Sequence, residues 1–164
     1  GTAVTVTMDG KRPLLAELQA LVVDTQMPSP RRAVSGLDSA RVAMILAVLE
    51  RRCGLKVARS EVYAATVGGM KTSEPAADLA LAAAITSAVT DVPLPPGVII
   101  LGEVGLAGEV RRVSGLGRRL AEAARLGFTH AITPEHDDAV PAGMMNKTVT
   151  NLGDALQSVR VRAR

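Results

Sequence analysis

Apolar and polar residues alternate over the first part of the chain. Residues 2–7 alternate Val with Thr, and residues 14–23 form a second, mainly apolar run, with Asp9 and Gly10 between the two. An alternation with a period of two is typical of a half-buried strand, and an Asp-Gly pair favours a tight turn. The pattern therefore predicts an N-terminal β-hairpin that ends before Pro28.

The apolar period then lengthens from two residues to between three and four. An apolar stripe at positions i, i+3, i+4 and i+7 is formed by Val42, Ile45, Leu46 and Leu49. This spacing predicts a helix with one buried face. Asp38 is suited to cap its N-terminus, and Gly54 is suited to end it in a left-handed conformation.

Apolar runs and turn residues outline the remaining elements. The predicted strands are 62–67, 98–101 and 131–133, and the predicted helices are 75–90, 114–127 and 152–159, followed by a basic tail with Arg160, Arg162 and Arg164. In the helix over 114–127, Ser114 is the expected N-cap, and Arg118 and Arg119 are expected on the outer face. Strands and helices interleave without a repeat or linker, which predicts one two-layer domain with helices covering a sheet.

Composition excludes several classes of protein. The 164 residues include one cysteine and two histidines, so neither an internal disulfide nor a zinc ligand set can form from them, and we expect no metal site. Cys53, His130 and His136 are expected to be structural. No apolar run reaches the length of about 18 residues that a membrane span needs, and no signal peptide is recognisable. These features predict a cytoplasmic protein with no membrane contact.

The charge is unevenly distributed along the chain. The net charge is only +3, from 19 basic and 16 acidic residues. Residues 31–60 carry seven bases against two acids (+5), residues 61–109 one base against six acids (−5), and residues 110–130 five bases against one acid (+4). Such segregation is found on surfaces that bind a charged partner or dock subunits head to tail, but charge runs are more often ordinary solvated surface.

Nucleotide-binding motifs are incomplete in this chain. Gly68-Gly69-Met70-Lys71-Thr72 lacks the glycine that precedes the lysine of a phosphate loop, and Gly115-Leu116-Gly117 lacks the third glycine of a dinucleotide fingerprint. Neither histidine lies in a motif centred on Ser or Cys. We therefore expect no nucleotide cofactor.

The glycine-rich stretch 102–111, with 113–116 and 121–128, resembles the Lon-protease-like domain. The stretches 36–38, 68–69 and 74–78 narrow the resemblance to the C-terminal domain of the bacterial RadA (Sms) family of DNA-repair proteins. It extends from about residue 4 to residue 155. The resemblance implies an α+β fold over residues 1–164, with a mixed sheet covered by helices.

The resemblance also provides a test for catalysis. Active Lon-type proteases carry a nucleophilic Ser in Pro-Ser-Ala-Gly and a general-base Lys in Gly-Leu-Lys, and a Ser–Lys dyad needs both groups. Here the motifs read Pro75-Ala76-Ala77-Asp78 and Gly115-Leu116-Gly117, so Ala76 and Gly117 occupy the two positions. The resemblance thus implies a domain without peptidase activity. A relocated dyad is the alternative, and its nearby candidates are Lys71, Ser73, Ser87 and Ser114.

Members of this family form hexameric rings, bind single-stranded DNA, hydrolyse ATP and promote branch migration. Their zinc module and RecA-like ATPase core precede the Lon-like domain, and this chain has neither a Cys-x-x-Cys pair nor a phosphate loop. The resemblance therefore implies that ATP, Mg and Zn belong to parts outside this fragment. It also implies that the fragment contributes a ring scaffold and a surface for single-stranded or branched DNA.

Arginine pairs are the candidates for DNA contact, and 1% aromatic content argues against base stacking. Any contact should therefore reach the phosphate backbone and depend strongly on salt. The candidate residues are Arg31, Arg32, Arg111, Arg112, Arg118 and Arg119. Solvated or intersubunit ion pairs are the alternative role for each pair, and a purely protein-binding module is the alternative function for the domain.

Overall fold

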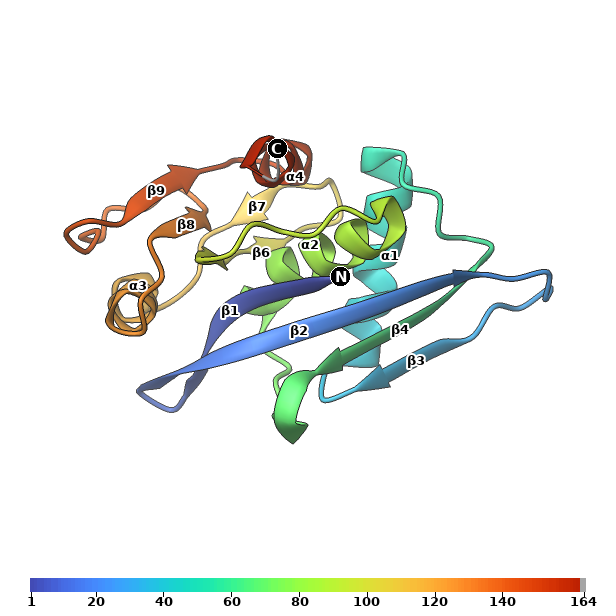
Figure 1. Ribbon diagram of the computed structural model, residues 1–164, viewed down its shortest axis with the longest axis horizontal. Helices are drawn as coiled ribbons and strands as arrows, with labels where there is room; N and C mark the ends of the chain where they lie inside the picture. Colours follow the sequence, from blue (N-terminus) through green and yellow to red (C-terminus); the bar gives the residue numbers. More distant parts are fainter. Residues whose placement is uncertain (163–164) are drawn as a thin grey trace.

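The computed structural model describes the backbone of residues 1–162 and the side chains of residues 1–159, so the predicted basic tail over 160–164 lies outside the described side chains. Within this part of the chain, a seven-stranded sheet has the order β3-β4-β2-β1-β5-β8-β9, and β6 pairs with β7 in a separate ribbon (Figure 1). The strands are β1 (Thr2–Asp9), β2 (Arg12–Asp24), β3 (Arg32–Ser35), β4 (Ser60–Thr66), β5 (Val98–Ile100), β6 (Glu103–Val104), β7 (Val110–Arg111), β8 (His130–Thr133) and β9 (Met145–Thr148). The helices are α1 (Ser39–Cys53), α2 (Asp78–Thr90), α3 (Leu116–Arg125) and α4 (Leu152–Arg162), with 3-10 turns at Val67–Gly69 and Pro75–Ala77.

The predicted hairpin is confirmed. Strands β1 and β2 pair antiparallel from Thr2 opposite Gln19 to Asp9 opposite Arg12, and Gly10 takes a positive φ of 62° in the turn. Strand β2 continues to Asp24, where it pairs with the start of β4. Its 13 residues make it the longest strand described, and it spans the sheet from one end to the other.

Local capping signals also predicted α1 correctly. The Asp38 side chain accepts a hydrogen bond from the Ala40 N–H at 2.9 Å, and Gly54 ends the helix at φ 69° with its N–H bonded to the Leu49 carbonyl. These contacts satisfy backbone groups that a helix end leaves without a partner.

The sheet has a hydrophobic cluster on each face. Helices α1, α2 and α4 pack on one face, whereas α3 packs on the other with Leu116 and Leu120. Neighbouring residues Ile99 and Ile100 of β5 belong to different clusters because side chains alternate along a strand. A mixed sheet covered by helices is therefore confirmed, and α3 adds cover on the second face.

Three expectations differ from the structure. Residues 32–35, for which the sequence predicted no strand, form the short strand β3, which is held by parallel pairing with β4. The predicted cap at Ser114 is wrong, because Gly115 at φ 65° occupies the N-cap of α3 and makes no side-chain bond. The predicted exposure of Arg119 is also wrong, since its side chain is only 1% exposed.

Candidate functional site

Ala76 lies in the 3-10 turn that leads into α2 and is buried. Its carbonyl accepts a hydrogen bond from Gly102 N–H at 3.0 Å, and the Gly102 carbonyl in turn accepts from Leu79 N–H at 3.0 Å. A Cβ added at Gly102 would lie 2.9 Å from the Val110 side chain. This glycine therefore allows the segment after β5 to lie close to Val110 while its N–H and carbonyl bond the turn at Ala76 and the start of α2.

Gly117 lies in the first turn of α3 and faces a carboxylate. Its N–H donates to Asp138 Oδ2 at 2.9 Å, and the Asp138 N–H donates to His136 Nδ1 at 3.1 Å. An acidic oxygen therefore satisfies the start of α3, where negative charge is favourable. A lysine placed here would meet a carboxylate, which raises an amine pKa instead of lowering it as a general base requires.

The candidates for a relocated dyad are not joined to one another. Ser87 donates to the Val92 carbonyl at 2.7 Å near the far end of α2, and Ser114 uses its carbonyl to accept from Arg119. Lys71 and Ser73 are exposed. Among the residues described, no hydrogen bond links a lysine amine to a serine hydroxyl.

Arg119 joins three parts of the fold. Its guanidinium donates to the Ser114 carbonyl at 2.9 Å and to the Val6 carbonyl at 2.8 Å, and it forms an ion pair with Glu74. Its position follows the inner stripe of α3, where Leu116, Leu120 and Ala123 are buried at helical spacing. That spacing could have predicted its burial. Because its side chain is buried, Arg119 is a structural residue and cannot contact DNA.

A second buried ion pair links α1 to α2. Arg41 donates two hydrogen bonds to the carboxylate of Asp78, which also accepts from the Val104 N–H at 3.1 Å. Burial raises the pKa of Asp78 above its ordinary value, and the bonds from Arg41 and Val104 oppose that shift. The hydrogen bond to Asp78 raises the pKa of Arg41, which stays charged. This pair holds the turn around Ala76 in place.

Four exposed cations gather at the far end of β2. The Arg31 carbonyl accepts from Val62 N–H at 3.0 Å, and the Arg59 carbonyl accepts from Thr25 N–H at 3.1 Å, so β2, β3 and β4 meet here. The Arg32 guanidinium donates to the carbonyls of Val57 (3.1 Å) and Ser60. We refer to the following residues as the Arg31 cluster: Arg31, Arg32, Lys56 and Arg59.

Carboxylates near the Arg31 cluster are occupied by uncharged donors. Glu50 accepts from the N–H groups of Val57 and Ala58, Asp24 accepts from the Ser60 hydroxyl, and Glu61 accepts from the Tyr63 hydroxyl. Within the described side chains, no carboxylate forms an ion pair with the cluster. Its positive charge is therefore not neutralised by contact. Lys56 and Arg59 were missed by the sequence reasoning, because only the pairing of distant strands brings them to Arg31.

The other candidate arginines lie elsewhere. Arg118 donates weakly to the Lys11 carbonyl at 3.4 Å, beside the β1–β2 turn, and we refer to Lys11, Arg12 and Arg118 as the Arg118 cluster. Because β2 has 13 residues, the two clusters lie roughly 40 Å apart. Arg111 pairs with Glu109, and Arg112 is exposed after β7. The six predicted arginines thus do not form one surface.

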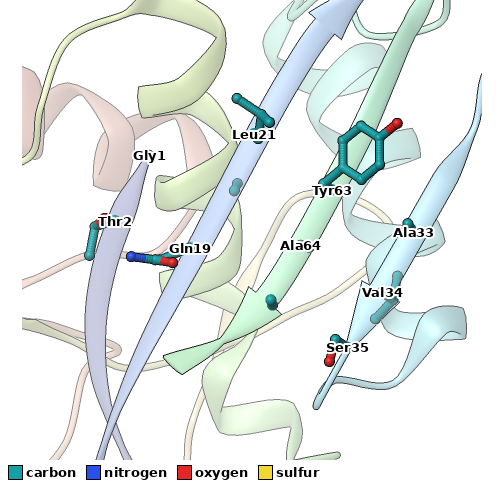
Figure 2. Close-up of a pocket in the computed structure, with 11 residues that line it drawn as sticks. Gly1, Thr2, Gln19, Leu21, Ala33, Val34, Ser35, Tyr63 and Ala64 are labelled. Carbon is teal, nitrogen blue, oxygen red and sulfur yellow. The ribbon is translucent and has the colours of Figure 1, made fainter. Parts of the chain in front are cut away.

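An open hollow on the sheet lies close to the Arg31 cluster, but its lining is uncharged. It measures about 510 Å³ and is lined mainly by residues of β1 to β4, including Gln19, Leu21, Ala33 and Tyr63 (Figure 2). No lysine or arginine lines it. Leu21 is 59% exposed, so this face of the sheet remains open to solvent. The lining is unsuited to phosphate.

Similarity to known proteins shows to which family this domain belongs. The chain belongs to the family of the Lon protease (S16) C-terminal proteolytic domain, which matches residues 38–159. It is 55% identical over 157 residues to the DNA repair protein RadA of Mycobacterium tuberculosis, covering 96% of this chain and 33% of that protein. It is 54% identical to RadA of Mycolicibacterium smegmatis (98% and 34% covered) and 46% identical to RadA of Streptococcus pyogenes serotype M6 (97% and 36%). The match is to the C-terminal Lon-like domain of RadA, and the chain spans about a third of the length of these relatives.

Membrane-spanning helices and metal-ligating clusters are both missing from the described residues. No helix there is long and apolar enough to cross a membrane. No group of three or more His, Cys, Asp or Glu side chains in that part of the chain is placed to hold a metal ion.

Proposed function

We propose that this chain is a non-catalytic domain of a DNA-repair ATPase, which supports hexameric ring assembly and binds DNA through the phosphate backbone. The observation that carries the proposal is the Arg31 cluster, whose exposed cations form no ion pair with any side chain of residues 1–159, on a Lon-type fold with Ala76 and Gly117 at the dyad positions. The proposed setting is cytoplasmic. Zinc, ATP and magnesium would bind to parts of a longer protein outside this single domain.

Phosphate attraction explains why such a cluster suits DNA. Lysine and arginine that neutralise phosphates release condensed counterions, which gives sequence-independent binding that weakens as salt rises. One cluster holds few phosphates, so each copy should bind weakly. A ring presents several identical clusters to one DNA molecule, and their combined affinity exceeds that of a single site.

Assembly is the second part of the proposal. The chain carries opposite charges on different segments, and the Arg118 cluster lies at the opposite end of β2 from the Arg31 cluster. Opposed surfaces of this kind suit head-to-tail contacts, which close into a ring when the rotation between neighbours is right. The Arg118 cluster, Arg111 and Arg112 are then available for subunit or DNA contacts.

The test uses the full chain with a fluorescently labelled single-stranded oligonucleotide. Anisotropy titrations at several salt concentrations should give binding that weakens steeply as salt rises. Light scattering on the same samples should show an assembly near six times the monomer mass of 17.0 kDa. Binding that is absent at low salt would remove the DNA part, and a monomer with and without DNA would remove the assembly part.

A further inference from the structure

The connection between β2 and β3, residues 25–31, carries an exposed apolar side chain. Met27 is 63% exposed and is followed by Pro28. Figure 1 shows this connection projecting past the end of β2, on the side of the molecule away from the β1–β2 turn. An exposed methionine alone is unremarkable, because folded proteins expose many apolar atoms. The residues around Met27 distinguish it from other exposed apolar side chains.

The projecting connection is anchored at both ends. At its start, the Thr25 N–H donates to the Arg59 carbonyl at 3.1 Å, and the Met27 N–H donates to the Thr25 hydroxyl at 3.2 Å. At its end, Arg31 accepts from Val62 N–H. Pro28 and Pro30 fix two φ angles between these anchors. The two ends of the connection are therefore fixed by hydrogen bonds.

Two cations of the Arg31 cluster lie at the base of this connection. Arg31 ends it, and Arg59 is bonded to its first residue. A DNA backbone held by these cations would bring its bases toward Met27. Methionine and proline are among the apolar side chains that proteins insert between base steps, beside basic residues that hold the backbone.

We propose that Met27, supported by Pro28, is a wedge that enters between neighbouring bases of DNA whose backbone is held by the Arg31 cluster. The inference rests on the DNA binding proposed above and extends it from phosphates to bases. Unstacking costs least where a base is already unpaired, so the ligand is the junction of a forked duplex. This contact needs no aromatic ring.

Met145 provides a matched control. It is 62% exposed, nearly the same as Met27, but lies on the edge strand β9 at the opposite edge of the sheet from β3. The cations of the Arg31 cluster are not near this edge. A wedge role should therefore distinguish two methionines of equal exposure by their surroundings.

The experiment uses the full chain and a forked duplex with 2-aminopurine at the junction, whose emission rises when it is unstacked. Binding of the wild-type chain should raise the emission. Met27→Ala and the similarly long but polar Met27→Gln should lose most of this rise, whereas Met27→Leu and Met145→Ala should keep it. The salt dependence of binding should stay unchanged in all four variants, because none removes a phosphate contact.

The outcomes separate this inference from the proposed function. Salt-dependent binding without a rise in emission overturns the wedge and leaves backbone binding intact. Absence of salt-dependent binding overturns both. If Met27→Ala keeps the rise but loses assembly in light scattering, Met27 is a subunit contact and the wedge is wrong.

Discussion

The two ends of β2 are both rich in basic residues, but they differ in how those charges are partnered. Near the β1–β2 turn, Arg119 is buried against Glu74 and Arg125 pairs with Glu122, which leaves Lys11, Arg12 and Arg118 without an ion pair among the described side chains. At the far end, the nearby carboxylates accept from backbone or hydroxyl groups, and no cation of the Arg31 cluster forms an ion pair in that same part of the chain. In the charge counts along the sequence, residues 31–60 (+5) and 110–130 (+4) look alike. The comparison shows that bases counted alike along the sequence can be paired inside the fold or left without an ion pair at its surface.

The largest expected effect concerns Arg119. Removing one member of a buried ion pair typically costs about 3–5 kcal/mol, because the remaining charge is left uncompensated. Arg119→Met should therefore lower the free energy of unfolding by about that amount in urea denaturation. The neighbouring exposed Arg118→Met should change it by less than about 0.5 kcal/mol. Equal effects of the two variants would contradict the assignment of Arg119 to the fold.

A smaller effect is expected at Arg32, which has a structural role within the Arg31 cluster. Its guanidinium holds the carbonyls of Val57 and Ser60. Arg32→Lys keeps the charge but loses the planar fork, so stability should fall by about 1 kcal/mol while DNA affinity stays nearly constant. Denaturation and anisotropy on one preparation check both. A loss of affinity without a loss of stability would show that Arg32 binds DNA through its fork.

No gain of activity is expected at the degenerate dyad. The double variant Ala76→Ser, Gly117→Lys restores both residue types, but the new lysine would lie beside Asp138, which accepts from Gly117 N–H. A neighbouring carboxylate keeps an amine protonated and unfit as a base. A fluorogenic peptide assay should show no turnover by this double variant, in which Asp138 is kept. Turnover by the wild-type chain would instead support a relocated dyad.

Elements with local signals could be predicted from the sequence. The hairpin follows from alternation around Asp9 and Gly10, and α1 follows from Asp38 and Gly54, because turns and caps are determined by a few neighbouring residues. Strands β3 and β9 have four residues each and are held by pairing with segments elsewhere in the chain, so they were missed. Strands β6 and β7 pair with each other, but with two residues each they are too short to show an alternating pattern.

The candidate site was predicted less completely than the fold. The dyad positions Ala76 and Gly117 rest on the motif resemblance and stay a prediction. The burial of Arg119 had a signal in its spacing from Leu116 and Leu120, but arginine is usually exposed and was assigned to the outer face. Lys56 and Arg59 could not be grouped with Arg31, because the grouping depends on the pairing of β2, β3 and β4.

The most direct test compares two triple variants that each remove three positive charges, one from each end of β2. The first is Arg31→Ala, Lys56→Ala, Arg59→Ala, and the second is Lys11→Ala, Arg12→Ala, Arg118→Ala. The readout is the slope of log affinity against log salt for single-stranded DNA. The first variant should reduce the steepness of this slope by about 2, at roughly 0.7 per lost phosphate contact, and the second should reduce it much less. An unchanged slope in the first variant, or an equal loss in the second, would contradict the claim that the Arg31 cluster binds DNA.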